Sequence, residues 1–236
     1  MSAFEEISDG ATSSIYFEQE HVHNVYNAIA DHFSETRYKP WPKVESFLLS
    51  QKPASLGADV GCGNGKYLSV NPDVVMIGSD RSSNLIDIAH SLKPTSDLIV
   101  ADAINLPHLS GVFDFAISIA MIHHFSTEER RIAAIKELLR ILNSSGQALL
   151  YVWALEQKDS RRGWDETDKQ DVMIPWKTRS SKRDPENGSN DTFYVRDRYY
   201  HLFRKGELED CARQGGAEII ESGYERDNWW VVIIKG

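Results

Sequence analysis

The chain of 236 residues is poor in cysteine, and its apolar runs are short. Its two cysteines, Cys62 and Cys211, lie far apart, with no C-x-x-C pair and no paired histidine spacing. This excludes a disulfide framework and indicates no zinc site, so we expect no bound metal and a reducing compartment. The longest apolar runs, such as Val231 to Ile234, are strand-sized, and the acidic N-terminus lacks a hydrophobic targeting core. These absences predict a soluble, cytoplasmic protein, with the nucleus as a second location, and no membrane partner.

Positive charge is also scarce, since 26 Lys and Arg stand against 35 Asp and Glu, a formal net charge of −9. An acidic total argues against a nucleic-acid partner, because phosphate binding normally needs a basic surface. The distribution differs from the total. From Lys177 to Lys205, eight basic residues stand against four acids, a local balance of +4, and aromatic residues are interleaved with them. A charge run is often only a solvated face, but this composition favours RNA.

One segment near residue 60 combines an acid at a strand end with three closely spaced glycines, Asp59 followed by Gly61, Gly63 and Gly65. Such a turn has no side chains in the way, so its backbone N–H groups can approach a ligand. The spacing G-x-G-x-G differs from the G-x-G-x-x-G that binds a pyrophosphate, and Asp59 would repel phosphates but accept bonds from an ammonium group. S-adenosylmethionine has an ammonium group and no phosphate, so the segment favours this cofactor. A tight strand-to-helix turn of any α/β protein is the alternative interpretation.

Two further apolar runs end in acids at similar intervals. Asp80 lies 21 residues after Asp59, where its carboxylate can accept both hydroxyls of a ribose. Asp102 lies 22 residues later, where it can accept from an adenine amino group while the N–H of Ala103 donates to the ring. Each acid alone is typical of a helix cap or a turn. Three of them at near-equal spacing favour the cofactor.

Strands and helices alternate along most of the chain, which predicts one α/β domain with a mostly parallel sheet. Residues 1–50 should form a linker and a lid helix, whose apolar period runs from Val22 to Phe33, over the cofactor cleft. The polar insertion 157–198 has no apolar period, so we expect it to be mobile at the active-site edge. The other predicted elements are helices at 43–50, after Lys66, and at 83–92, 127–142 and 205–214, and strands ending at 60, 80 and 102 and spanning 113–120, 147–153, 218–222 and 228–234, the last two as a hairpin.

Assembled, these segments resemble class I S-adenosylmethionine-dependent methyltransferases over nearly the whole chain. More specific strings resemble the eukaryotic tRNA wobble-uridine carboxymethyl methyltransferases: R-Y-K-P-W-P at 37–42, I-H-H-F-S-T at 122–127 and Y-V-W-A-x-E-Q at 151–157. The resemblance implies a Rossmann-like, seven-stranded, mostly parallel sheet with a C-terminal antiparallel hairpin. It implies methyl transfer to the carboxylate of 5-carboxymethyluridine at the wobble position of the tRNA anticodon loop. It also implies a small zinc-binding activator as a partner.

A carboxylate acceptor needs alignment more than a general base, because it is already an anion at neutral pH. A cation or donors must then hold one of its oxygens while the other attacks. The candidate catalytic residues are His123, His124, Arg37, Trp153, Arg198 and Tyr200, with Trp153 placed to stack on a flipped base. The candidate cofactor residues are Tyr26, Arg37, Asp59, Gly61, Gly63, Gly65, Asp80, Arg81, Asp102, Ala103 and Ile119. Packed histidines, a surface arginine and a core tryptophan are the structural alternatives.

The third strand, Leu98-Ile99-Val100-Ala101, lies at a sheet edge in the topology that the resemblance implies. An apolar edge without charge or proline invites another strand, so we expect the activator to dock there. Two other functions stay open. One is a small-molecule C- or O-methyltransferase of the quinone-biosynthetic type, against which the basic rim argues. The other is a non-catalytic methyltransferase-like scaffold subunit, against which the three intact acids argue.

Overall fold

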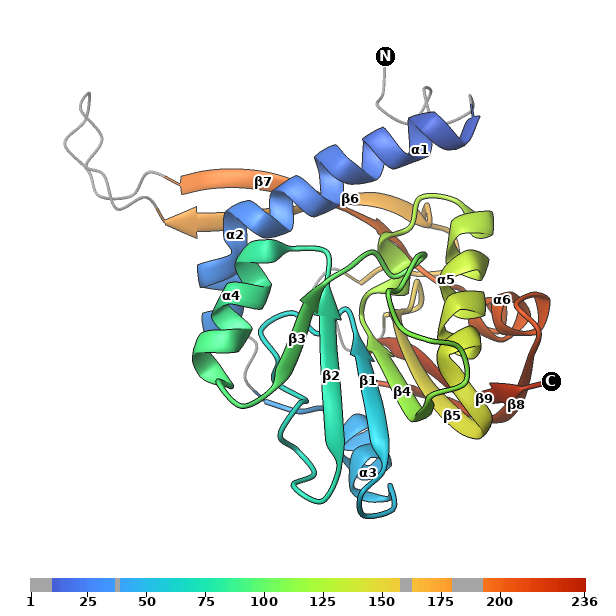
Figure 1. The fold of residues 1–236 in the computed structure, drawn as a ribbon. Coiled ribbons are helices and arrows are strands. Elements are labelled where there is room, and N and C mark those ends of the chain that lie inside the picture. Colours follow the sequence, from blue (N-terminus) through green and yellow to red (C-terminus); the bar gives the residue numbers. More distant parts are fainter. Residues whose placement is uncertain (1–9, 37–38, 158–162, 180–192) are drawn as a thin grey trace.

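A seven-stranded sheet forms the centre of the molecule (Figure 1), and its strand order is β3-β2-β1-β4-β5-β9-β8. The computed structural model describes residues 10–36, 39–157, 163–179 and 193–236. The first five strands are parallel to one another, whereas β9 is antiparallel to both β5 and β8. The strands are β1 (Leu56–Val60), β2 (Val75–Asp80), β3 (Asp97–Val100), β4 (Phe113–Ile119), β5 (Leu142–Trp153), β8 (Ala217–Glu225) and β9 (Asn228–Lys235). The predicted fold class, with its C-terminal hairpin, is confirmed.

Helices cover both faces of the sheet because successive strand residues point to opposite sides. On β4, Ala116 belongs to the apolar cluster with α5 (Glu128–Ile141) and α6 (Glu207–Gln214). Its neighbours Phe115 and Ile117 belong to the cluster with α3 (Pro42–Leu49). The remaining sheet helix, α4 (Ser83–Leu92), begins at the cap Ser82, whose hydroxyl accepts a bond from the Leu85 N–H. Helix α5 begins in the same way, since the side chain of Thr127 accepts a bond from the Arg130 N–H.

The N-terminal part of the described chain forms a long helical run that crosses the molecule near α4 and the strands β6 and β7 (Figure 1). It comprises α1 (Gly10–Glu18), a π-helical turn (Gln19–His23) and α2 (Asn24–Glu35). The helix predicted from Val22 to Phe33 is therefore present, and α1 extends it at its N-terminal end; its role as a lid stays a prediction. Asn27 fixes α2 to α4, since its Oδ1 accepts a bond of 2.5 Å from the Ser82 hydroxyl.

The insertion between 157 and 198 contains regular structure that the sequence pattern did not reveal. Strands β6 (Asp171–Arg179) and β7 (Phe193–His201) form a separate antiparallel pair. The sequence analysis predicted no strand in these residues, and the expected mobility of the insertion stays a prediction. One face of the pair is buried only near its base, where Ile174 and Tyr200 pack with Leu155 and Leu202, so the apolar alternation is too short to stand out. Lys182 and Arg183, two of the eight basic residues between Lys177 and Lys205, lie outside the described residues.

The helix predicted after Lys66 is absent, because residues 61–70 form a series of turns. The bonds from Leu68 N to Gly65 O and from Val70 N to Tyr67 O span three residues each, as in isolated turns. Pro72 follows too closely for an α-helix to develop between it and the glycines. Strand β3 also ends at Val100, two residues earlier than predicted, which leaves Asp102 in a loop. No helix in the described ranges is long and apolar enough to cross a membrane.

Glu18 anchors the helical run from α1 to α2, which we call the lid run, to the body of the protein. Its buried carboxylate accepts bonds from the backbone and hydroxyl of Ser126 (2.8 and 2.9 Å) and from Nε and Nη2 of Arg130 (2.8 and 2.7 Å). We expect Glu18→Ala to lower the free energy of unfolding by about 2–4 kcal/mol, because buried donors lose their acceptor. Urea unfolding measures the effect. Glu20→Ala, at an exposed position of the same run, is the control. Equal stability of the two variants would contradict the anchoring role.

Candidate active site

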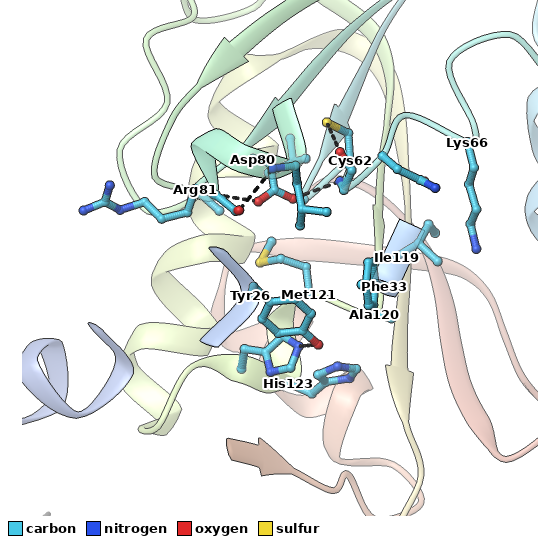
Figure 2. A pocket seen from close by; sticks show the side chains of 18 of the residues that line it. Tyr26, Phe33, Cys62, Lys66, Asp80, Arg81, Ile119, Ala120, Met121 and His123 are labelled. Carbon is cyan, nitrogen blue, oxygen red and sulfur yellow. Dashed lines mark hydrogen bonds between the residues drawn. The ribbon is translucent and has the colours of Figure 1, made fainter. Parts of the chain in front are cut away.

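A cavity of about 540 Å³ opens at the carboxyl ends of β1, β2 and β4, beneath the lid run. Its wall is formed by the loops after these strands, by α2 and by the base of β7. In Figure 2, Asp80 and Cys62 lie on one side of the cavity, and Tyr26 and His123 lie on the other. The cavity therefore has two halves, which we describe in turn.

The glycine loop after β1 forms the wall of the first half. Gly61, Gly63 and Gly65 all have positive φ angles, of 85°, 55° and 74°, which side chains rarely adopt. A Cβ at Gly61 would also lie 2.6 Å from Cγ of Met121. The backbone N–H of Gly63 donates to Oδ2 of Asp80 at 2.9 Å, so the carboxylate after β2 holds the loop in place.

Asp80 and Asp102 both line the cavity, as predicted, together with Arg81, Ala103 and Ile119. Oδ1 of Asp80 accepts the N–H of Ser82 at 2.9 Å, and burial raises the pKa of this carboxyl. Oδ1 of Asp102 accepts the N–H of Ile104 at 3.0 Å, and Nε of Arg81 lies 3.9 Å from its other oxygen. The two carboxylates that were expected to hold ribose and adenine thus reach the same cavity from neighbouring loops.

Asp59 lies behind the cavity wall rather than on it. Its side chain is 1% exposed, and neither carboxylate oxygen has a hydrogen-bond partner among the described residues. Burial raises the pKa of this carboxyl to about 7; the charge of Lys66 opposes the rise and that of Asp80 adds to it. A buried carboxylate without donors is costly unless a cation or donor from a ligand satisfies it. This orphaned carboxylate and the open glycine cradle fit S-adenosylmethionine.

Four side chains on the other half share one hydrogen-bond network. His124 Nδ1 lies 2.9 Å from the carbonyl of Tyr199, so it carries the proton and donates. Its Nε2, 3.0 Å from the Tyr26 hydroxyl, must then accept. The Tyr26 oxygen is left to accept from the hydroxyl of Tyr200 at 3.0 Å and from Nη1 of Arg198 at 3.3 Å. Burial lowers the pKa of His124 to about 3, so this neutral arrangement persists at ordinary pH.

His123 presents a hydrogen-bond donor in the cavity wall. Its Nδ1 accepts the backbone N–H of Trp153 at 3.1 Å, and burial, with the nearby charge of Arg198, holds its pKa well below the usual range. The neutral ring therefore carries its proton on Nε2, which has no partner among the described residues. Trp153 itself stacks on Tyr200, with ring centroids 4.5 Å apart and planes 20° apart.

Arg198 is a buried cation in the same wall. It is 4% exposed, and its guanidinium lies 4.5 Å from the ring of Trp176 and 5.2 Å from that of Tyr200. Burial works against its charge, but the hydroxyls of Tyr26 and Tyr200 raise its pKa on balance. Within the part of the chain that the structure describes, no carboxylate lies within 4 Å of it. An anionic ligand is the natural partner for such a group.

The structure thus brings every predicted site residue to the cavity wall except three. Arg37 lies outside the described residues, Asp59 stands behind the wall, and Gly65 packs against Leu68 and Ala89 instead of lining the cavity. Tyr26, predicted to contact the cofactor, lines the cavity, and its hydroxyl belongs to the His124 network; its contact with the cofactor stays a prediction. The sequence analysis did not single out several residues that line the cavity or stack on its arginine: His23, Phe33, Tyr67, Met121, Phe125 and Trp176. The only available signal was that Phe33 lies on the apolar stripe of the lid and Phe125 in a recognised string.

Comparisons with known proteins agree with this geometry. Residues 58–150 match the model of a methyltransferase domain. The chain is 52% identical over 229 residues to the tRNA (carboxymethyluridine(34)-5-O)-methyltransferase of Schizosaccharomyces pombe, a match covering 94% of this chain and 99% of the relative. The enzyme of that name from Saccharomyces cerevisiae is 46% identical, covering 92% and 96%. The chain belongs to this methyltransferase family.

A solved structure from Haloferax volcanii shares the fold, with a TM-score of 0.64 at 16% identity over 89% of this chain and 96% of that one. It is a complex between the Trm112 methyltransferase activator and a methyltransferase. The predicted family, fold and S-adenosylmethionine-dependent enzyme class are confirmed. The roles of the individual site residues stay predictions.

The raised pKa of Asp59 gives stability a specific pH dependence. The folded state favours the protonated carboxyl more than the unfolded state does. The contribution of Asp59 to the free energy of unfolding is therefore most favourable below about pH 4 and is lost as pH rises toward 7. Asn at this position cannot ionise. We therefore expect Asp59→Asn to gain on the order of 2 kcal/mol over wild type between pH 5 and pH 8, measured by urea unfolding without cofactor. Asp97→Asn, on the exposed edge strand, should show no such gain. If the free energies of unfolding of Asp59→Asn and wild type change in parallel with pH, the raised pKa of Asp59 is contradicted.

Proposed function

We propose that this chain transfers the methyl group of S-adenosylmethionine to the carboxylate of 5-carboxymethyluridine at the tRNA wobble position, forming the methyl ester. The observation that carries the residue-level proposal is Arg198, a buried cation in the cavity wall with no carboxylate partner among the described residues. An anionic acceptor would satisfy it. The names of the full-length relatives support the same substrate.

The two halves of the cavity then take different roles. The glycine loop, Asp80 and Asp102 would hold the nucleoside part of the cofactor, with Asp59 behind them facing its ammonium group. The bound cofactor supplies a methyl group on a positively charged sulfur. Arg198 and the Nε2–H of His123 would hold one oxygen of the acceptor carboxylate, which leaves the other free to attack. Orientation of the two reactants is then the main source of rate.

No side chain needs to remove a proton in this scheme. A carboxylic acid with a pKa near 4 is fully ionised at neutral pH. His123 and His124 both have lowered pKa values, so they remain neutral and act through fixed hydrogen bonds. The stacked pair of Trp153 and Tyr200 offers an aromatic wall for the extruded uracil ring. Arg37 stays a candidate on sequence grounds alone.

Transfer of a labelled methyl group to RNA tests the proposal. The acceptors are a tRNA that carries 5-carboxymethyluridine at the wobble position and the same tRNA with unmodified uridine there. We expect label in the first alone, in a form that mild alkali releases as an ester would. Label in neither would refute the proposal. Label in small quinone precursors would support the small-molecule methyltransferase, and cofactor binding without transfer to any acceptor would support the scaffold.

The role of Arg198 in holding the acceptor can be tested separately from the identity of the substrate. We expect Arg198→Ala to lower the single-turnover rate by about 10²–10³-fold, the usual loss when a preorganised charge or donor is removed from the reacting group. Cofactor affinity measured by calorimetry should be unchanged, since the arginine lies in the other half. Arg213→Ala, at a surface ion pair, is the control. A rate within threefold of wild type would remove Arg198 from the acceptor site.

We propose that a Trm112-type activator docks on the free edge of the sheet, at β3. Strand β3 lies at one end of the strand order, as predicted, and pairs only with β2 in the described structure. Val100 on this strand is 48% exposed, and Leu92 at the end of α4 is 56% exposed. Unpaired backbone groups beside apolar side chains are a template for strand addition. A partner strand here would also adjoin the loop that carries Asp102. The Haloferax volcanii complex with Trm112 supports a partner of this type.

We expect the double variant Ile99→Lys with Ile88→Glu to lose co-elution with a Trm112-type activator on size exclusion, because both introduce charge at the proposed contact. Ile220→Lys is the matched control. It places the same charge on β8, the strand at the opposite edge, where Ile220 is 53% exposed. Co-elution of the double variant, or its loss in the control alone, would place the interface elsewhere.

A further inference from the structure

The antiparallel pair β6–β7 carries its charges unequally on its two faces. Directly paired residues of antiparallel strands share a face, and alternate residues along a strand do so as well. Trp176 pairs with Arg196, and Thr178 pairs with Tyr194. One face, which we call the cleft face, therefore presents eight residues, Val172, Ile174, Trp176 and Thr178 from β6 and Tyr194, Arg196, Arg198 and Tyr200 from β7. None of the eight is acidic, whereas Asp171 and Asp197 both lie on the opposite face.

Along β7 the cleft face forms a row that begins inside the cavity and ends in solvent. Tyr200 and Arg198 are 2% and 4% exposed and line the cavity, whereas Arg196 is exposed and Tyr194 is 55% exposed. The ring of Trp176, opposite Arg196, stacks on the Arg198 guanidinium and so joins the two parts. Alternate side chains of a strand are about 6.8 Å apart, so each can contact a different unit of an extended chain. Along β7 the row therefore carries two adjacent cations, Arg196 and Arg198, between Tyr194 and Tyr200.

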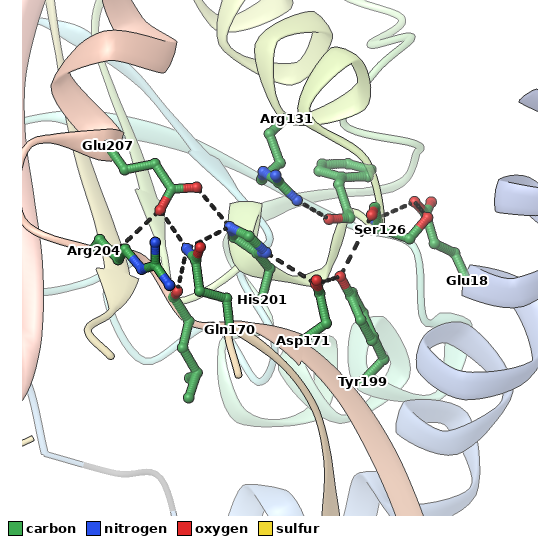
Figure 3. Close-up of polar contacts among 11 residues, drawn as sticks. Glu18, Ser126, Arg131, Gln170, Asp171, Tyr199, His201, Arg204 and Glu207 are labelled. Atoms are coloured by element: carbon green, nitrogen blue, oxygen red, sulfur yellow. Dashed lines mark hydrogen bonds and ion pairs between the residues drawn. The ribbon is translucent and has the colours of Figure 1, made fainter. Parts of the chain in front are cut away.

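The opposite face fixes the base of the pair to the body of the protein (Figure 3). Asp171 accepts from the Tyr199 hydroxyl at 2.5 Å and lies 3.0 Å from Nδ1 of His201. Nε2 of His201 lies 2.6 Å from Glu207 of α6. Burial opposes the charged imidazole, but its bonds to Asp171 and Glu207 raise its pKa on balance. The row is therefore anchored on a fixed base at the cavity.

From this arrangement we infer that the outer part of the row, Arg196 and Tyr194, binds the single-stranded RNA next to the nucleotide that enters the cavity. The inference rests on the proposed function, because the row begins at the acceptor half. Arginine neutralises a phosphate and tyrosine stacks on a base, and stacking of this kind tolerates any sequence. A single-stranded loop is the form of RNA that offers unstacked bases to such a surface.

The test compares the two faces of the strand pair at the same position along the strands. Arg196→Ala with Tyr194→Ala removes the outer row. Lys177→Ala removes an equally exposed cation from the opposite face, because Lys177 pairs with Val195. The probe is an anticodon stem-loop carrying 5-carboxymethyluridine, with affinity measured by fluorescence anisotropy at several salt concentrations. We expect the double variant to raise Kd about tenfold or more and to reduce the salt slope by about one, with less than a twofold change for Lys177→Ala.

Two further readouts separate this inference from the proposed function and from loss of folding. The single-turnover rate at saturating RNA should be unchanged in the double variant, since Arg198 and Tyr200 remain. Binding to a duplex of the stem alone should be equally weak in all three proteins. An equal loss of RNA affinity in the variants of the two faces, or no loss in either, would overturn the inference while leaving methylation by wild type intact. Absence of methylation by wild type would instead refute the proposed function.

Discussion

The hydroxyl of Tyr26 is the point at which the acceptor half of the site is assembled. It donates to His124, which follows β4, and accepts from Arg198 and Tyr200 on β7. Because His124 uses its other nitrogen for the carbonyl of Tyr199, the direction of every bond in this network is fixed. Helix α2, the segment after β4 and strand β7 are far apart in the sequence. The Tyr26 hydroxyl thereby holds them in fixed positions relative to one another. Nε of Arg198 has no partner among the described residues, so a further acceptor is needed to complete this network.

The two halves of the cavity carry different charged groups. Asp80 and Asp102 line the side of the glycine loop, where a positively charged cofactor is expected, and Arg81 lines the same side near Asp102. The cation Arg198 and the neutral donor His123 stand on the other side, without a carboxylate among the described residues near Arg198. The two reactants would meet at the boundary between these halves. The protein thus supplies a cavity in which the reacting groups are positioned before any bond changes.

Much of the cofactor half was predictable because it depends on short segments. Asp59, the three glycines, Asp80 and Asp102 lie at or just beyond the carboxyl ends of successive strands, so parallel pairing alone brings them to one edge of the sheet. The acceptor half depends on contacts between distant elements. Tyr26 and His124 are 98 residues apart, and Tyr26 and Tyr200 are 174 apart, so no local pattern announces their contact. The strands β6 and β7 escaped prediction because their outer residues are polar and exposed. Trp176, which stacks on Arg198, was noted only as one of the aromatic residues beside the basic run, with no place in the site.

The pH dependence of the chemical step tests the central claim most directly. At saturating cofactor, which holds Asp59 in one state, the single-turnover rate on RNA carrying 5-carboxymethyluridine should be constant from about pH 6 to pH 8. The acceptor is already ionised in that range, and His124, with a pKa of about 3, does not titrate there. A rate that rises tenfold per pH unit, with the protein still folded, would show that a proton must leave the acceptor first. That result would contradict a carboxylate held by Arg198 and His123.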